Sequence, residues 1–248
     1  MYRYAAGFLV SATFAVTPLS VLANPLVIVP TGLNPGDQYR LAFVTTTPSL
    51  SYSSDIDDYN DLVTTVANSV SELVALGTTW KVIGSTDAVD ARDNTGTNPF
   101  SSPGVPIYNT AGELVALSNS DLWDGSIVHA IDFYESAGTS GNTVVWTGTR
   151  ADGTASEGFD VLRPSGALGS TSLNPIIAPT VFTMTGSAGS INSSWIHSAL
   201  NSHDQPLDLY GMSGILTVVP EPSALVLACL AGAGLAVSSL RRRRQCKR

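Results

Sequence analysis

Cysteine is scarce in this chain and absent from most of it. The only two cysteines, Cys229 and Cys246, lie among the last twenty residues. Residues 24–219 therefore fold without disulfides and hold no zinc ion on cysteine thiolates. A segment of this length can bury enough apolar surface to fold without such cross-links.

Positive charge is also scarce in this segment. Residues 24–219 carry 5 basic and 19 acidic side chains, a net charge of −14, whereas the whole chain, with its basic C-terminus, has −8. So acidic a segment repels nucleic acids and anionic lipid surfaces, and we predict no nucleic-acid partner. It is compatible with cations, neutral sugars or basic partners, and equally with simple solubility.

Recognisable catalytic patterns are missing as well. The three histidines, His129, His197 and His203, are scattered along the chain. No Gly-x-Ser-x-Gly elbow, His-Glu-x-x-His helix or phosphate-binding glycine loop occurs. The sequence therefore predicts a protein that is not an enzyme, with a hydrolase as the alternative.

Residues 1–23 have the organisation of a secretory signal peptide. Arg3 supplies the positive start, residues 5–16 form the apolar centre, and residues 21–23 give a small-residue cleavage pattern. We expect cleavage directly after this pattern, which leaves residues 24–219 as an exported domain.

A second apolar segment lies near the C-terminus. Residues 223–240 are 18 residues without a charge, and four arginines follow them. As a helix this segment would be ~27 Å long, close to the ~30 Å of a bilayer core. The arginines mark the cytoplasmic side by the positive-inside rule. We predict a transmembrane helix that leaves the middle of the chain outside the cytoplasm.

A Pro-Glu-Pro motif, the apolar helix and an arginine block follow one another in residues 220–248. The motif and the block are formed by Pro220, Glu221, Pro222, Arg241, Arg242, Arg243 and Arg244. This order resembles the PEP-CTERM sorting signal of exosortase-containing bacteria. The resemblance implies processing by exosortase, an integral-membrane cysteine protease, and delivery to the cell surface or an extracellular polysaccharide matrix. A plain membrane anchor that is never cut is the alternative.

The exported domain begins with a strand candidate and then a strong helix signal. The helix is predicted over residues 54–76, with Ser54 as its cap and Gly77 at its end. Apolar residues recur in it at intervals of three or four and predict one buried stripe, made of Ile56, Tyr59, Val63, Val66, Val70, Leu73 and Leu76.

Short strands are predicted through the rest of the domain. The candidates are residues 38–47, 78–85, 142–149 and 207–219, together with a hairpin over residues 105–117 that turns at residues 109–112. One long early helix, short antiparallel strands and long loops predict a single α+β domain.

This order of elements is similar to bacterial secreted domains of the C-type-lectin-like or endostatin-like fold. The similarity covers about residues 37–215 and includes the stretches "WKVIGS", "PIYNTAGELVA" and "VVWTGTRADGTAS". The calcium-dependent sugar motif of C-type lectins is not matched, because Leu207 separates Pro206 from Asp208 and no Trp-Asn-Asp occurs.

Two groups of residues are candidates for ligand binding. An oxygen-rich loop offers possible calcium ligands in Asp87, Asp90, Asp93 and Asn94, although an ordinary polar turn would have the same composition. Trp123 and Trp195 have polar neighbours, where a tryptophan either stacks on a sugar or packs in the core. We predict a structural or adhesive surface protein, with a carbohydrate- or calcium-binding module as the alternative.

Overall fold

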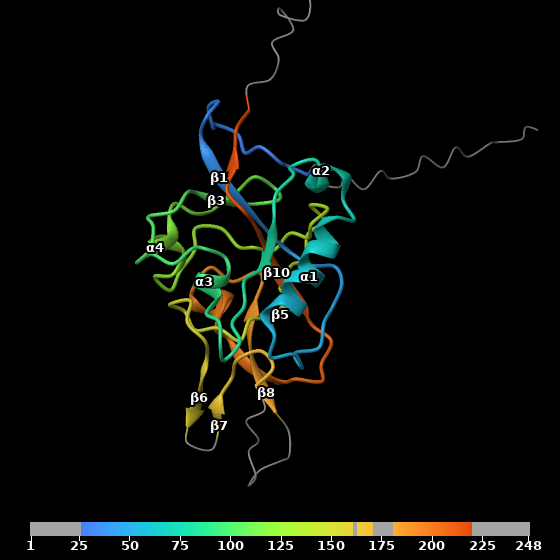
Figure 1. Cartoon of the computed structure of the whole chain (residues 1–248), viewed down its shortest axis with the longest axis vertical. Helices are drawn as coiled ribbons and strands as arrows, with labels where there is room; N and C mark the ends of the chain where they lie inside the picture. The colour runs from blue at the N-terminus through green and yellow to red at the C-terminus, as the bar shows by residue number, and fades with distance from the viewer. Residues whose placement is uncertain (1–25, 161–162, 171–180, 220–248) are drawn as a thin grey trace, which may run out of the picture.

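β-Strands dominate the structure, a computed structural model that describes residues 26–160, 163–170 and 181–219. Within these residues nine strands form one mixed sheet, whose central strands Figure 1 shows. In spatial order its main path is β4 (Leu114–Ala116), β3 (Ile107–Asn109), β1 (Gln38–Val44), β10 (Asp208–Ser213), β5 (Val144–Trp146), β8 (Phe182–Ser187) and β9 (Ala199–Ser202).

The remaining elements attach to this path. β11 (Leu216–Thr217) pairs with β1, and β2 (Trp80–Val82) pairs with β10. A separate hairpin is formed by β6 (Glu157–Asp160) and β7 (Arg163–Ser165). The described helices are short: α1 (Ile56–Ala67), α2 (Ser71–Val74), α3 (Ala91–Asn94), α4 (Asn119–Leu122) and the 3-10 turn η1 (Ser193–Trp195).

The sheet is organised around the antiparallel pair of β1 and β10. At both ends of this pair a hydroxyl group extends the backbone ladder. The Leu41 N–H donates to Ser213 Oγ at 2.9 Å, and the Leu209 N–H donates to Thr45 Oγ1 at 2.9 Å. These bonds satisfy buried N–H groups where regular pairing stops.

One face of β1 packs under α1. Tyr39, Leu41 and Phe43 alternate along the strand and are buried in a cluster with Tyr59 and Val63 of the helix. Period-two alternation places these three side chains on one face of the sheet. Figure 1 shows α1 and α2 on one side of the central strands and α4 on the other.

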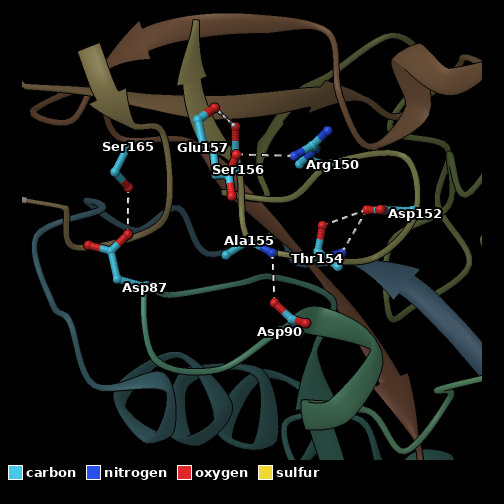
Figure 2. Close-up of a pocket in the computed structure, with 9 residues that line it drawn as sticks. All are labelled: Asp87, Asp90, Arg150, Asp152, Thr154, Ala155, Ser156, Glu157 and Ser165. Carbon is cyan, nitrogen blue, oxygen red and sulfur yellow. Dashed lines mark hydrogen bonds and ion pairs between the residues drawn. The ribbon is translucent and has the colours of Figure 1, made fainter. Parts of the chain in front are cut away.

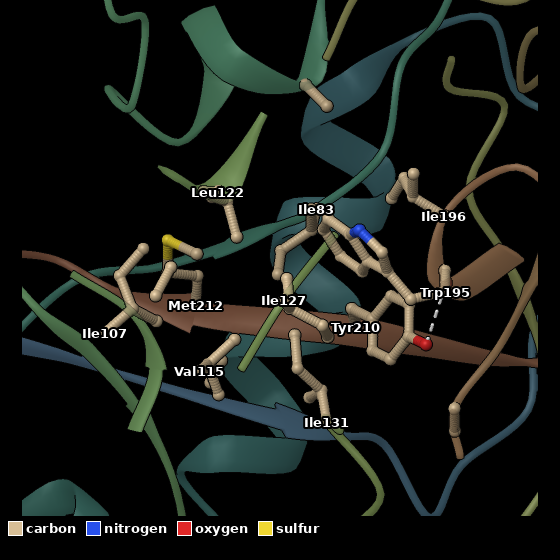
Figure 3. Packing of buried hydrophobic residues seen from close by; sticks show 14 of the residues in the cluster. Ile83, Ile107, Val115, Leu122, Ile127, Ile131, Trp195, Ile196, Tyr210 and Met212 are labelled. Atoms are coloured by element: carbon tan, nitrogen blue, oxygen red, sulfur yellow. Dashed lines mark hydrogen bonds between the residues drawn. The ribbon is translucent and has the colours of Figure 1, made fainter. Parts of the chain in front are cut away.

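The other face carries a second buried cluster. Ala42 and Val44 of β1 join Tyr210 and Met212 of β10 there, under a layer of loops (Figure 3). The Tyr210 hydroxyl donates to the Trp195 carbonyl oxygen at 3.0 Å, which joins this layer to the sheet. Because both faces are covered, the central strands have apolar residues at consecutive positions.

The helix prediction was correct in position and wrong in length. α1 is twelve residues long, with Asp55 as its cap, and it ends at Ala67. Asn68 and Ser69 follow, and the Ser69 hydroxyl bonds back to the Val66 carbonyl at 2.7 Å. Asn and Ser favour such local bonds over helix continuation.

The predicted fold class, an α+β domain of C-type-lectin-like type, is wrong. The fold is mostly β, and two pairings, β1 with β3 and β5 with β10, are parallel rather than antiparallel. Parallel neighbours need a crossover, and the connection from β1 to β3 provides one that contains α1, α2, β2 and α3. Among the described residues no helix is long and apolar enough to span a membrane, and residues 223–240 lie outside them.

Several local predictions are confirmed. Strands occur within all four predicted ranges, and β3 and β4 form the predicted hairpin, with Gly112 at a φ of 84° in its turn. The last predicted strand is divided into β10 and β11. Ala42 pairs with Met212, and Tyr39 pairs with Leu216, so two residues of β1 lie opposite three residues of the β10–β11 segment. The extra residue forms a β-bulge at Gly214 and Ile215.

We expect Gly211→Ala to destabilise the domain. A Cβ at this position of β10 would lie 2.7 Å from both Phe43 Cζ and Val63 Cγ1, so the strand, its neighbour or α1 must shift. The expected loss is about 1–3 kcal/mol, the usual cost of overpacking a buried site. Urea unfolding would measure it.

Gly138→Ala is the matched control. A Cβ on Gly138 would have Tyr134 Cδ2 as its nearest neighbour, at 3.8 Å, so we expect a change within about 0.5 kcal/mol. Equal effects of the two substitutions would contradict the close packing of α1 on β10 as the cause.

Candidate functional site

A polar pocket of about 440 Å³ lies between the β6–β7 hairpin and the loop that leads into α3 (Figure 2). Its lining comes from three separate parts of the chain. These are the loop after β2, the turn and strand after β5, and the end of β7, with the residues Asp87, Asp90, Arg150, Asp152, Thr154, Ala155, Ser156, Glu157 and Ser165.

Two of its carboxylates join these parts together. Asp87 accepts a hydrogen bond from the Ser165 hydroxyl at 2.5 Å. Asp90 accepts one from the Ala155 N–H at 2.8 Å, and its second oxygen lies 3.4 Å from Arg92 Nη2. The pocket is therefore shaped by contacts between residues that are distant in sequence.

Asp152 lies in an Asp-Gly-Thr turn at the pocket wall. Its Oδ1 accepts hydrogen bonds from the Thr154 N–H at 3.1 Å and the Thr154 hydroxyl at 2.6 Å. Burial opposes ionisation, but these bonds and the charges of Arg150 and Arg92 outweigh it and lower the pKa of the Asp152 carboxyl. Asp152 is therefore a carboxylate at neutral pH.

An exposed aromatic ring lies beyond Arg92. The Arg92 guanidinium carbon is 5.7 Å from the centroid of the Phe100 ring, and Phe100 is 86% exposed. On the pocket wall, Arg150 Nη1 lies 3.5 Å from Glu157 Oε2. The region thus combines hydrogen-bond acceptors, guanidinium donors and one apolar surface.

The structure separates the four predicted calcium ligands. Asp87 and Asp90 reach the pocket, whereas Asp93 accepts a bond from Asn98 Nδ2 at 2.6 Å. Asn94 points inward, where its Nδ2 donates to the Val82 carbonyl at 2.8 Å. Within the described ranges no group of three or more His, Cys, Asp or Glu side chains could hold a metal ion.

Both candidate tryptophans for sugar stacking are core residues. Trp195 is fully buried, and Trp123 is buried with its Nε1–H donating to Thr97 Oγ1 at 3.0 Å. The two rings contact each other, with centroids 5.8 Å apart. Neither ring has a face available to a ligand, which corrects the stacking prediction in favour of core packing.

Outside the pocket, two acidic residues, Glu135 and Asp208, lie near each other where β1 ends and β10 begins. Glu135 is buried, and its oxygens accept bonds from the Thr46 N–H at 3.1 Å and the Thr46 hydroxyl at 2.5 Å. Asp208, the first residue of β10, is partly buried nearby. Burial, reinforced by the charge of Glu135, raises the pKa of the Asp208 carboxyl to about 6.

Sequence reasoning missed Phe100, Arg150, Asp152 and Glu157. Phe100 lies in the Asn-, Pro- and Ser-rich stretch "TNPFSSPG", where no other apolar residues recur at helix or strand spacing. This pattern indicates an exposed ring. The Asp-Gly pair of "RADGTASEG" indicates a turn. Only the tertiary structure brings this turn together with Asp87 and Ser165.

Residues 218–244 match the PEP-CTERM protein-sorting motif. Of this segment the structure describes Val218 and Val219, while Pro220 to Pro222, Arg241 to Arg244 and the predicted signal peptide lie outside the described residues. The match identifies an exported protein that is sorted by exosortase. Comparison with curated proteins finds no match, and neither comparison supports the C-type-lectin-like resemblance.

We predict that Asp208→Asn stabilises the protein in a pH-dependent way. Because the pKa of Asp208 is raised in the folded state, its protonated side chain favours folding. This contribution to the free energy of unfolding is fully present below about pH 4 and is lost as the pH rises through about 6. Removing the charge should therefore add about 1 kcal/mol at pH 8, after allowance for solvent screening, and little at pH 4. Thermal melting should show a gain of about 2–4 °C at pH 8.

Asp204→Asn provides a control, because the pKa of Asp204 is shifted in the opposite direction to that of Asp208. Hydrogen bonds from Ser202 and Gln205 lower the pKa of the Asp204 carboxyl, so its removal should bring no gain at pH 8. A gain for Asp208→Asn that is the same at pH 4 and pH 8 would contradict the electrostatic explanation.

Proposed function

We propose that this exported protein is an adhesive component of the cell surface or extracellular matrix, and that it binds neutral polysaccharide at the pocket of Figure 2. Its sorting motif implies a transient membrane anchor that exosortase processes. The proposed activity is binding rather than catalysis. The observation that carries it is a pocket in which the Asp152 carboxylate and other acidic side chains lie beside a guanidinium group and hydroxyls.

The chemistry of the pocket suits a ligand that is rich in hydroxyl groups. A sugar hydroxyl both donates and accepts, so it can bond to the Asp152 carboxylate and to Arg150 at the same time. Phe100 lies outside the pocket lining, but Arg92 contacts both the Asp90 carboxylate and the Phe100 ring, so a sugar chain that extends from the pocket can rest its C–H face on this exposed ring. Polar groups that fix orientation beside an apolar surface are typical of small-ligand sites.

The charge of the domain favours an uncharged polymer. Residues 24–219 have a net charge of −14, so an acidic polysaccharide would be repelled at long range. A neutral chain pays no such penalty. The substrate class that we propose is therefore a neutral glycan of the surrounding matrix.

We expect Asp152→Asn to weaken binding of neutral polysaccharide about tenfold, which corresponds to one lost charge-assisted hydrogen bond. The measurement is affinity electrophoresis of the processed protein in gels that contain dextran, galactomannan or polysaccharide isolated from its own host. Phe100→Ala should have a similar effect if the ring supports the sugar.

Asp124→Asn is a closely matched control. Asp124 begins an Asp-Gly-Ser turn in which it accepts from the Ser126 N–H at 3.0 Å and the Ser126 hydroxyl at 3.1 Å, as Asp152 does with Thr154. It does not line the pocket. Equal retardation of wild type, Asp152→Asn and Asp124→Asn would refute the proposal. Retardation that disappears on chelation would favour the calcium-binding alternative.

Placement at the surface also depends on the tail. With Pro220, Glu221 and Pro222 replaced by alanines, residues 223–240 keep their apolar length, so the protein should still insert and remain in the membrane fraction. Fractionation of the native host would show this. A variant that distributes like wild type would mean that the tail is only a tether.

A further inference from the structure

The last described segment, residues 215–219, contains β11 (Leu216–Thr217) and leads into the sorting motif. Its side chains alternate strictly: Leu216 and Val218 are buried in the cluster under α1, while Ile215, Thr217 and Val219 are exposed. Ile215 is 50% exposed and Val219 is 77% exposed. Residues 215–219 therefore present an outward ridge of Ile215, Thr217 and Val219, apolar at its two ends, which leads toward Pro220.

A tight turn at residues 34–37 holds the end of this segment at Val218. Pro35 and Gly36, which has a φ of 95°, occupy the two central positions of a type II turn. The Asp37 carboxylate closes it by accepting from the Asn34 N–H at 2.7 Å. The Gly36 N–H donates to the Val218 carbonyl at 2.9 Å, and the Val218 N–H donates to the Asp37 carbonyl at 2.9 Å.

Very little chain separates this anchored residue from the membrane segment. After Val218, residues 219–222 precede the apolar run that begins at Ser223, and four extended residues span at most about 14 Å. The lipid head groups occupy roughly 5–7 Å of that distance. Before processing, the end of the domain that holds the turn and β11 must therefore lie almost at the membrane surface. Figure 1 shows this end at the top of the view.

We infer that the outward ridge formed by Ile215, Thr217 and Val219 is a contact surface for the sorting protease. An enzyme that reaches Pro220–Pro222 within so short a gap has no room to act without meeting this ridge. Two of its three side chains are apolar, and the carboxylate of the neighbouring Asp37 is occupied by the turn. The enzyme thus recognises the folded domain as well as the tail.

Ile215→Glu in the full-length chain, expressed in the native host, tests this inference. We expect the rate of tail removal, followed by pulse-chase and immunoblotting, to fall at least threefold. Ile191→Glu is the matched control, because Ile191 is 54% exposed in the loop before η1, and it should be processed like wild type. Melting curves of the two variants should agree, since both side chains are exposed.

A flexible insertion distinguishes the loss of a contact with the protease from damage to the fold of the domain. With twelve Gly and Ser residues between Val219 and Pro220, Ile215→Glu should be processed as fast as the matching chain with Ile215. Slower processing caused by the insertion alone would also support the contact, because the domain is then moved away from the enzyme. A normal rate for Ile215→Glu without the insertion would overturn the inference, as would a deficit of the same size with it.

Ile215→Lys distinguishes the enzyme from the lipid surface. A protease contact that is apolar loses binding with either charge, so this variant should also be slow. Contact with anionic lipid would instead tolerate or favour lysine. Processing of Ile215→Lys at the wild-type rate or faster would overturn the assignment to the protease.

Discussion

The pairing of β1 with β10 is the interaction on which the rest of the domain depends. The side chains of β1 enter both buried clusters, and every other strand of the main sheet pairs with β1 or β10 directly or is connected to them through one or two intervening strands. Its closeness to α1 requires a residue without a side chain at Gly211. Buried polar groups reinforce it, since Arg40 Nη1 of β1 donates to the Ser213 carbonyl at 2.8 Å. Burial lowers the pKa of this guanidinium, yet Arg40 keeps its charge at any physiological pH.

Elements that depend on local patterns were predictable from the sequence. The stripe from Ile56 to Val66 identified α1, and the Asn109–Gly112 turn identified the β3–β4 hairpin, because periodicity and turn chemistry act over a few residues. The parallel pairings were not predictable in this way. β1 meets β3 across a connection that contains α1 and β2, and only the tertiary fold specifies that neighbour.

The candidate site, too, was only partly predictable from the sequence. Asp87 and Asp90 stand out in the sequence because their loop is rich in oxygen ligands, and they do line the pocket. Their companion Asn94 could not be excluded by composition, because its role in bonding the Val82 carbonyl depends on how α3 packs on β2. Trp195 has polar neighbours in sequence, yet it is buried because η1 folds back over β8. Polar neighbours therefore predict exposure poorly in short, irregular segments.

The position of the central pair in the chain has a consequence for export. β1 lies near the start of the exported domain, while β10 and β11 lie at its end, directly before the sorting motif. A chain that crosses the membrane from its N-terminus thus delivers β1 long before its central partners. The two apolar faces of β1 remain incompletely covered until residues 208–218 have crossed. Closure of the domain therefore waits until the chain has been exported as far as its sorting motif.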